Sequence, residues 1–575
     1  MSCLAGTLGP AAIGGLTQSS SGLWRYRQVC REPGTPVDSP RISAVEGWDL
    51  MVETLIKNGR VYDGTGSEWF GASVAIEKAK IQLISGDTSS LKARRVIDAT
   101  GKIVCPGFVD MHAHSTMVIL KHPEHEPKVR QGVTTELIGV DGNSYAPFLS
   151  AEDLRHWGML NGGLDGHLPE NPQWLTVDEY LSQYDRRVAV NIAYVIGNAP
   201  LRISSVGWNN RPPTDSEARK MLELLRSGMR DGAFGMSTGL TYPPGSYATP
   251  DEIAVLCEVV RDMGGVYVTH IRYGSGDGFI DPNLEALDVG RRTGVPVHVS
   301  HFASTWKRNG QFRPLLGLVE DATSDGVDVT FDAYPYVHTG SRALVMIPEW
   351  THEGGPQALL ARLRDPKVRS RMRQETDPRA ARWRAGDGIT LGGFRKPQNK
   401  KLDGMTIGQI AEELAKDPLD ALCDLLLDEN LGISEVGLYA NNATNNRKVL
   451  AHPRCMVGSD ALLLGDYPSP RSYGTFPKVL GDLVRDEGLL SMADAIRKIT
   501  SLPAQRLGLQ DRGILRNGFV ADLVIFDPLE IHSPATLESP RQFPLGISHV
   551  MVNGVLVIDD GEHTGALPGR VLRNV

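Results

Sequence analysis

The stretch PGFVDMHAH, residues 106–114, is a short apolar strand that ends in two histidines. Residues two apart on a strand point to the same side, so His112 and His114 can direct two imidazoles at one point beyond the strand end. Imidazole is a good ligand for zinc and similar ions. A single HxH pair is weak evidence in a chain with fifteen histidines, and its weight comes from its position after a first group of β-strands.

Short apolar runs continue outward from this stretch and alternate with helical patterns. The runs cover residues 108–112, 135–139, 190–196, 233–237, 266–270, 295–301, 327–331 and 456–460. Helical patterns such as 215–230, 251–263 and 283–293 lie between them. Eight strands that alternate with helices imply a parallel sheet, so we predict an α/β fold with a closed (β/α)8 TIM-like barrel. An open doubly wound sheet is the competitor, and the lack of a GxGxxG after an early strand disfavours it.

Strand-rich segments flank this middle region. Alternating β-branched runs with Asn-Gly and Asp-Gly turn signals occur before residue 106 and after residue 520. We therefore predict a barrel over residues 106–508 and a small β-sandwich built from residues 51–105 and 509–575. The connection from residue 331 to residue 456 is too long for a loop, so we predict an inserted subdomain at about residues 337–452, between strands seven and eight.

Composition and charge indicate which kinds of partner and which cell compartment to expect. The 575 residues carry a formal net charge of −8, which makes nucleic acid a poor partner. No stretch approaches the roughly 18 continuous apolar residues of a membrane span. The six cysteines form no CxxC pair, which indicates a reducing, cytoplasmic location. Residues 1–50 are interpreted as a disordered extension, with a transit peptide as the alternative; a homo-oligomer stays open.

More metal-binding residue types fall at later strand ends. His270, His301 and Asp460 end the fifth, sixth and eighth runs, and Asp141 follows the second. Barrel active sites form at the C-terminal ends of the strands, so these side chains can converge on one ion. One such histidine alone usually reflects packing. His298 is three residues from His301 and faces the other side of a straight strand, so we interpret it as a supporting or buried structural residue.

At this point the chain resembles the D-aminoacylase (N-acyl-D-amino-acid deacylase) branch of the amidohydrolases. The likeness runs from about residue 52 to the C-terminus. The matching segments include PGFVDMHAH (106–114), GAFGMSTGLTYPPGSYA (232–248), GGVYVTHIR (264–272), VPVHVSHF (295–302), DAYPY (332–336), VGSDA (457–461) and SYGTFPKVLG (472–481). The tyrosine-bearing and SYGTFPKVLG segments are far more specific than the histidine pair.

The resemblance implies roles for individual residues. It implies metal ligands at five positions, namely His112, His114, Asp141, His270 and His301, for one or two Zn²⁺ ions or another divalent metal. It makes Asp460 the general base and Tyr334 the donor to the oxyanion. It also implies substrate contacts for Tyr242 and Arg471, to which we add the neighbouring Arg272.

Two departures from the family pattern concern metal and substrate. The best-known D-aminoacylases have Cys where this chain has Asp141, and a carboxylate is a harder ligand than a thiolate. A Lys often found two residues after the sixth-strand histidine is replaced by Ala303. Carboxylate recognition then depends on Arg471, Tyr242 or Arg272.

The function implied by the resemblance is metal-dependent hydrolysis of small N-acyl-D-amino acids to a carboxylate and a free D-amino acid. Strand four, residues 232–238, has no Lys, which argues against hydantoinases and dihydroorotases, since these use a carbamylated Lys there. Two alternatives remain open. One is hydrolysis of another linear amide, peptide-like or from a toxin; the other is a non-catalytic interaction protein.

Overall fold

The computed structural model describes residues 51–84, 87–89, 91–273, 279–302, 312–384, 388–437 and 443–574. The predicted extension 1–50 and Ala303 lie outside these residues. The described chain mixes parallel strands with helices, which confirms the predicted α/β class.

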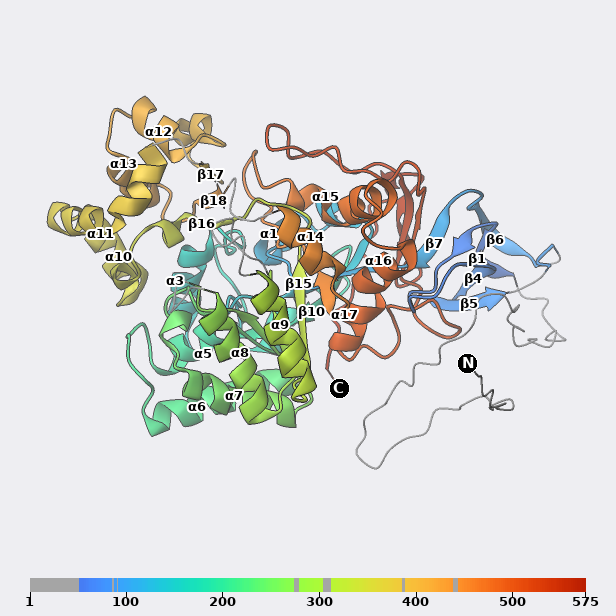
Figure 1. The fold of residues 1–575 in the computed structure, drawn as a ribbon, viewed down its shortest axis with the longest axis horizontal. Coiled ribbons are helices and arrows are strands. Elements are labelled where there is room, and N and C mark those ends of the chain that lie inside the picture. The colour runs from blue at the N-terminus through green and yellow to red at the C-terminus, as the bar shows by residue number, and fades with distance from the viewer. Residues whose placement is uncertain are drawn as a thin grey trace, which may run out of the picture. The chain divides into compact units, whose positions relative to one another are not determined.

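Nine short parallel strands occur in the described part of the predicted middle region, and Figure 1 shows two of them, β10 and β15, among helices. They are β8 (Phe108–Asp110), β9 (Val133–Ile138), β10 (Asn191–Tyr194), β11 (Ile196–Gly197), β12 (Gly235–Gly239), β13 (Val266–His270), β14 (Val297–Val299), β15 (Val329–Ala333) and β19 (Cys455–Val457). They pair in two parallel ladders, β8-β9-β10 and β11-β12-β13-β14-β15-β19. Every residue of these strands is buried, as expected where both faces of a parallel sheet are covered.

The two ladders are connected at both ends. Only Val195 separates β10 from β11, so the ladders meet within one extended segment. At the other end, the Met111 amide donates to the Val457 carbonyl at 3.5 Å. Ala113 and Ala461 form a parallel bridge just beyond the strands. The carboxyl-terminal ends of strands β8 and β19 therefore lie side by side.

Helices occupy the connections between these strands. They are α1 (Thr116–Lys121), α2 (Glu126–Val129), α3 (Ala151–Asn161), α4 (Val177–Leu181), α5 (Asn198–Ser205), α6 (Asp215–Arg230), α7 (Pro250–Asp262), α8 (Ile280–Thr293) and α9 (Phe312–Ser324). Helix α6 shows why these segments are helical. Thr214 and Glu217 form a capping box at its start, and Met221, Leu225 and Met229 form its buried face.

The two ends of the chain share a sheet. One sheet has the order β5-β4-β1-β6, and the other has the order β23-β22-β21-β20-β7-β2-β3. Their strands are β1 (Val52–Lys57), β2 (Arg60–Val61), β3 (Phe70–Gly71), β4 (Ser73–Glu77), β5 (Lys80–Ile84), β6 (Ala93–Asp98), β7 (Ile103–Pro106), β20 (Leu523–Phe526), β21 (Ile547–Val552), β22 (Val555–Asp559) and β23 (Glu562–His563). One hydrophobic cluster joins both sheets, with Ile76 from the first and Ile525 from the second.

The long connection between β15 and β19 folds into its own group of elements. It contains β16 (Ser341–Arg342), β17 (Ile389–Gly392), β18 (Ser434–Gly437), α10 (Gly355–Arg364), α11 (Pro366–Arg384), α12 (Ile407–Glu413), α13 (Pro418–Asp428) and α14 (Ala443–Ala451). Figure 1 shows α10 to α13 gathered in one group. The three strands form an antiparallel sheet in the order β16-β18-β17.

The segment after β19 returns to helices before the shared sheet. It contains α15 (Arg471–Lys478), a π-helical turn (Val479–Asp486), α16 (Met492–Ile499) and α17 (Ser501–Arg506). Within the described ranges, no helix is long and apolar enough to cross a bilayer. The four cysteines that the structure describes are buried and unpaired.

Candidate metal centre and active site

The two histidines of the opening stretch lie directly after β8. His112 and His114 are both buried, and their Nε2 atoms are 3.3 Å apart. The Asp460 amide donates to the His112 carbonyl at 2.9 Å. The ends of the first and last parallel strands are thus hydrogen-bonded at the same point where the two imidazoles meet.

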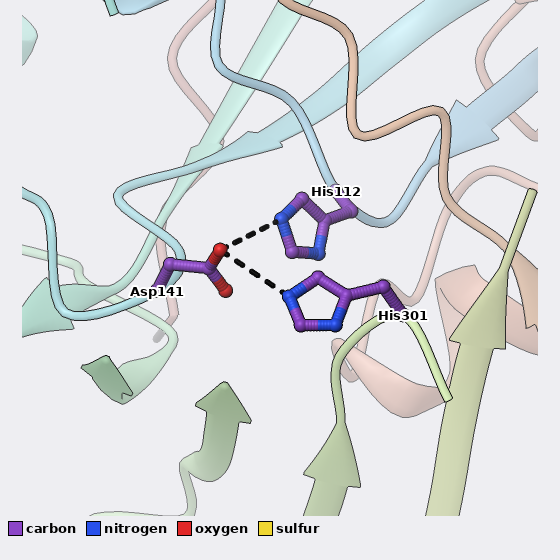
Figure 2. Close-up of side chains that lie close together, drawn as sticks. All are labelled: His112, Asp141 and His301. Atoms are coloured by element: carbon purple, nitrogen blue, oxygen red, sulfur yellow. Dashed lines mark ion pairs between the residues drawn. The ribbon is translucent and has the colours of Figure 1, made fainter. Parts of the chain in front are cut away.

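Asp141 lies at the centre of four imidazoles. Its Oδ2 atom is 3.5 Å from Nε2 of both His112 and His114. The same oxygen is 3.4 Å from Nδ1 of His270 and from Nε2 of His301. Figure 2 shows the Asp141 carboxylate facing His112 and His301. All five predicted ligand positions therefore converge, although they come from four different strand ends.

Asp460 lies next to the pair formed by His112 and His114. Its Oδ1 atom is 3.7 Å from His112 Nε2 and 3.5 Å from His114 Nε2. Its Oδ2 atom is 3.1 Å from a terminal nitrogen of Arg471, which is fully buried. One carboxylate oxygen therefore faces the imidazoles, and the other accepts a charged contact from Arg471.

Three of these residues have left-handed backbones. The φ angles are 55° at Asp141, 34° at His301 and 47° at Asp460. Non-glycine residues rarely adopt this region, and such strain concentrates at functional sites. The surrounding fold therefore holds these side chains in place at an energetic cost.

Additional side chains orient the imidazoles from behind. Asp165 Oδ1 is 2.9 Å from His114 Nδ1, and Thr241 Oγ1 is 2.7 Å from His270 Nε2. The Tyr273 hydroxyl is 3.1 Å from His301 Nδ1. A hydrogen bond to one ring nitrogen fixes the ring and directs the other nitrogen to the centre.

Sequence reasoning missed these orienting residues. Thr241 and Tyr273 are sequence neighbours of residues that it did single out, and only that proximity could have indicated them. Asp165 lies in a loop with no motif around it.

His298 has the supporting place that its spacing predicts. Its Nε2 is 2.9 Å from Asp332 Oδ2, and Asp332 Oδ1 accepts the His301 amide at 2.9 Å. Asp332 Oδ2 is also 3.7 Å from His112 Nδ1. His298 is fully buried and acts on the cluster through Asp332.

A second layer of buried charge lies beneath the strand ends. The Lys128 ammonium contacts Asp110, lies 2.6 Å from Ser459 Oγ and lies 3.3 Å from Glu136. The Asp110 carboxylate in turn accepts the amides of His112 at 3.1 Å and Ser459 at 2.8 Å. This network connects the loop that carries His112 to the residue before Asp460.

Electrostatics couple the central groups. Burial disfavours the charged form of each, but Asp141 and Asp460 raise the pKa of His112 well above its usual value. Burial is likewise outweighed at Asp141, where His112, His301 and His270 hold the pKa well below its usual value. At His270 burial prevails and lowers the pKa. Histidine ligands must be neutral, so a bound metal competes with protons here.

The donor set fits a divalent cation. Two pairs of ring nitrogens face each other, with 3.3 Å for His112 and His114 and 3.0 Å for His270 and His301. Asp141 Oδ1 is buried without a hydrogen-bond partner. At this centre, two groups of ligand atoms from described residues lie close enough to hold an ion, His112–Asp141–His301 and His112–His114–Asp460. Imidazoles with carboxylates suit zinc and similar ions.

The predicted substrate residues fall into two classes. The Tyr242 ring lies 4.7 Å from the His270 ring, and the Arg471 guanidinium carbon lies 4.5 Å from the Tyr334 ring. Tyr242 therefore borders a predicted metal ligand, and Tyr334 packs on Arg471, which contacts Asp460. Arg272 differs, because its guanidinium bonds Glu285 and the carbonyls of residues 246 and 248. These contacts favour a role for Arg272 in holding the segment that contains residues 246 and 248.

The sequence of this chain is similar to a known protein family and to individual members of it. The amidohydrolase family model matches residues 95–558. The chain is 33% identical to D-aminoacylase of Alcaligenes xylosoxydans xylosoxydans, over 90% of this chain and 97% of the relative. It is also 33% identical to N-acyl-D-glutamate deacylase of the same organism, over 91% of this chain and 96% of the relative.

Solved structures give the same result. An N-acyl-D-glutamate deacylase from Bordetella bronchiseptica, complexed with zinc and a phosphonate mimic of the tetrahedral intermediate, matches with a TM-score of 0.75 and 29% identity. A D-aminoacylase structure described by its binuclear metal centre matches with a TM-score of 0.76 and 32% identity. Both matches cover 91% of this chain and 100% of the other. The resemblance predicted from the sequence motifs is confirmed.

Proposed function

This chain belongs to the amidohydrolase family, and we propose that it hydrolyses the amide bond of N-acyl-D-amino acids in a metal-dependent reaction. The products are a carboxylate and a free D-amino acid. The observation that carries the proposal is the convergence of four imidazoles and Asp141 within 3.5 Å, next to Asp460. The relatives named as deacylases support the substrate class.

The proposal includes the finer architecture. We infer that the parallel strands close into a (β/α)8 barrel, supported by the contacts between the ends of β8 and β19. We infer the domain limits 51–105 with 509–575 for the β-sandwich, and about 337–452 for the inserted subdomain. Pairing of β7 with β20 supports the sandwich, since it joins the two ends of the chain.

The proposed metal ligands are His112, His114, Asp141, His270 and His301, for one or two zinc ions. Asp141 Oδ2 lies within 3.5 Å of a ring nitrogen of all four histidines, so this carboxylate would help to hold a metal at that point. A bound divalent ion supplies Lewis-acid character and lowers the pKa of water from about 15.7 to about 7.

The chain's own residues handle protons and orientation. Asp460 accepts a proton at its carboxylate from the attacking water and returns it to the leaving nitrogen. Arg471, which contacts Asp460 at 3.1 Å, keeps that carboxylate oriented. Tyr334 donates to the developing oxyanion, a contact whose loss costs roughly 3 kcal/mol in other enzymes. Tyr242, packed on His270, borders the substrate.

The test is the Asp460→Asn variant with N-acetyl-D-leucine and its L enantiomer. The asparagine keeps the size of the side chain but cannot act as a base, so we expect zinc content to stay within twofold of wild type and turnover to fall at least 1000-fold, the upper part of the range for lost acid–base catalysis. Zinc is measured by elemental analysis and turnover by release of the free amine.

A matched control is Asp428→Asn, which removes a carboxylate bonded to Lys396 in the inserted segment and should leave turnover unchanged. Wild-type turnover in Asp460→Asn would contradict the base assignment. Equal rates on both enantiomers, or turnover of other linear amides alone, would contradict the D-amino-acid assignment.

A further inference from the structure

A buried glutamate on the inserted segment faces the proposed active site. Glu435 lies on β18 directly opposite Ser341 on β16, in an antiparallel pair. Directly opposed residues in such a pair point to the same face. The Ser341 hydroxyl lies 3.2 Å from the Tyr242 hydroxyl, and the Tyr242 ring packs on the metal-centre residue His270. Glu435 therefore points to the face of this small sheet that borders the metal centre.

The carboxylate of Glu435 accepts no hydrogen bond from the residues that the structure describes, and its oxygens are not among the fully buried polar atoms. The side chain is 7% exposed. Burial raises its pKa to about 7, and the charges that act on it are those of Arg471 and Asp460. Arg471 already directs a terminal nitrogen to Asp460 at 3.1 Å. A mostly buried carboxylate is poorly hydrated, so a ligand that brings a hydrogen-bond donor stabilises it.

The charges around this point disfavour a second anion. Arg471 carries one positive charge, which the Asp460 carboxylate compensates. Ionised Glu435 adds a further negative charge close to Arg471 and Asp460, outside the proposed metal ligands. A carboxylate on the substrate would meet like charge in a partly dehydrated setting, whereas an amide N–H₂ would donate to Glu435.

We propose that Glu435 is a specificity-determining residue that selects N-acyl-D-amino acids whose side chain carries a hydrogen-bond donor and rejects those whose side chain carries a carboxylate. This inference rests on the proposed deacylase function. It adds a substrate preference, and the charge that discriminates comes from β18, outside the metal ligands.

N-acetyl-D-glutamine and N-acetyl-D-glutamate are a matched pair for the test, because they differ only in side-chain amide against carboxylate. The assay is kcat/KM for both at pH 8, above the pKa of about 7, so that Glu435 is ionised. We expect wild type to favour the glutamine substrate at least tenfold. In Glu435→Gln this ratio should fall at least tenfold. Glu413→Gln, an exposed glutamate of the same segment, should keep the wild-type ratio.

The outcomes separate this inference from the proposed function. Turnover of N-acetyl-D-leucine with no preference for glutamine over glutamate in wild type overturns the role of Glu435 and leaves the deacylase function standing. An unchanged ratio of kcat/KM for the glutamine and glutamate substrates in Glu435→Gln likewise overturns the role of Glu435. A failure of wild type to hydrolyse any of the three substrates overturns the proposed function and this inference together. Because the wild-type ratio is itself decisive, the test does not depend on the variant folding.

Discussion

The Asp165→Asn substitution is expected to weaken zinc binding about tenfold without unfolding the protein. Asp165 is 1% exposed, and its Oδ1 lies 2.9 Å from His114 Nδ1. Loss of a carboxylate that orients a metal-bound histidine typically costs 10–100-fold in metal affinity. Asparagine has the same shape and keeps an accepting oxygen but loses the charge. We therefore expect the lower end, about tenfold or ~1.4 kcal/mol.

The assay is competition for zinc between the protein and a chelator of known affinity, at constant pH. Circular dichroism and thermal unfolding establish that the variant remains folded. Tyr145→Phe is the matched control, because the Tyr145 hydroxyl bonds the other oxygen of Asp165 at 3.1 Å, and its removal leaves the charge in place. We expect its zinc Kd to change less than threefold. An unchanged Kd in a folded Asp165→Asn protein would refute the argument that His114 binds metal through Nε2.

Three further predictions follow from burial and charge. Lys128→Met leaves two buried carboxylates without their ammonium partner and should cost about 3–5 kcal/mol in urea unfolding, whereas the half-exposed Lys80→Met should cost less than about 0.5 kcal/mol; equal costs would contradict it. His270→Ala should lower zinc content per chain, and unchanged content would remove His270 from the ligand set. Burial lowers the pKa of His352 to about 3, so below pH 6.5 the unfolded chain takes up a proton that the folded chain does not. This should remove about 2 kcal/mol of stability between pH 7.5 and pH 5; His352→Gln should lose correspondingly less, and equal losses would contradict it.

Local sequence patterns predicted most of the elements that position the site. The helix expected at residues 215–230 is α6 with the same bounds, because a capping box marks its start and its apolar residues recur at helical spacing. The strand expected at 266–270 is β13 with the same bounds. Such signals depend on neighbours in the sequence, so one chain read alone contains them.

Other element limits differed from the sequence predictions. The sixth run, expected at 295–301, is a strand only over Val297–Val299, and the third run is divided into β10 and β11 at Val195. Both differences arise where the backbone leaves the ladder. Pairing partners decide where that happens, and they lie far away in the sequence.

In the candidate site, too, some residues could be identified from the sequence and others could not. Residue types at strand ends were sufficient to make His112, His270, His301 and Asp460 candidates, and their roles came from the family resemblance. Their orienting partners were not predictable, since Asp165 comes from a loop without a motif. The engagement of Arg272 with Glu285 and two carbonyls was equally hidden, because it depends on how two connections pack.

The sequence by itself determined the α/β class, the order of strands and helices, and the set of imidazoles and carboxylates available for a metal. These follow from periodicity and residue chemistry, which are local properties. Only the tertiary structure decided that Asp141 lies between both histidine pairs, that Arg471 contacts Asp460, and that Glu435 pairs with Ser341 beside Tyr242. Those distances depend on how distant segments pack around the strand ends, and no local pattern encodes that packing.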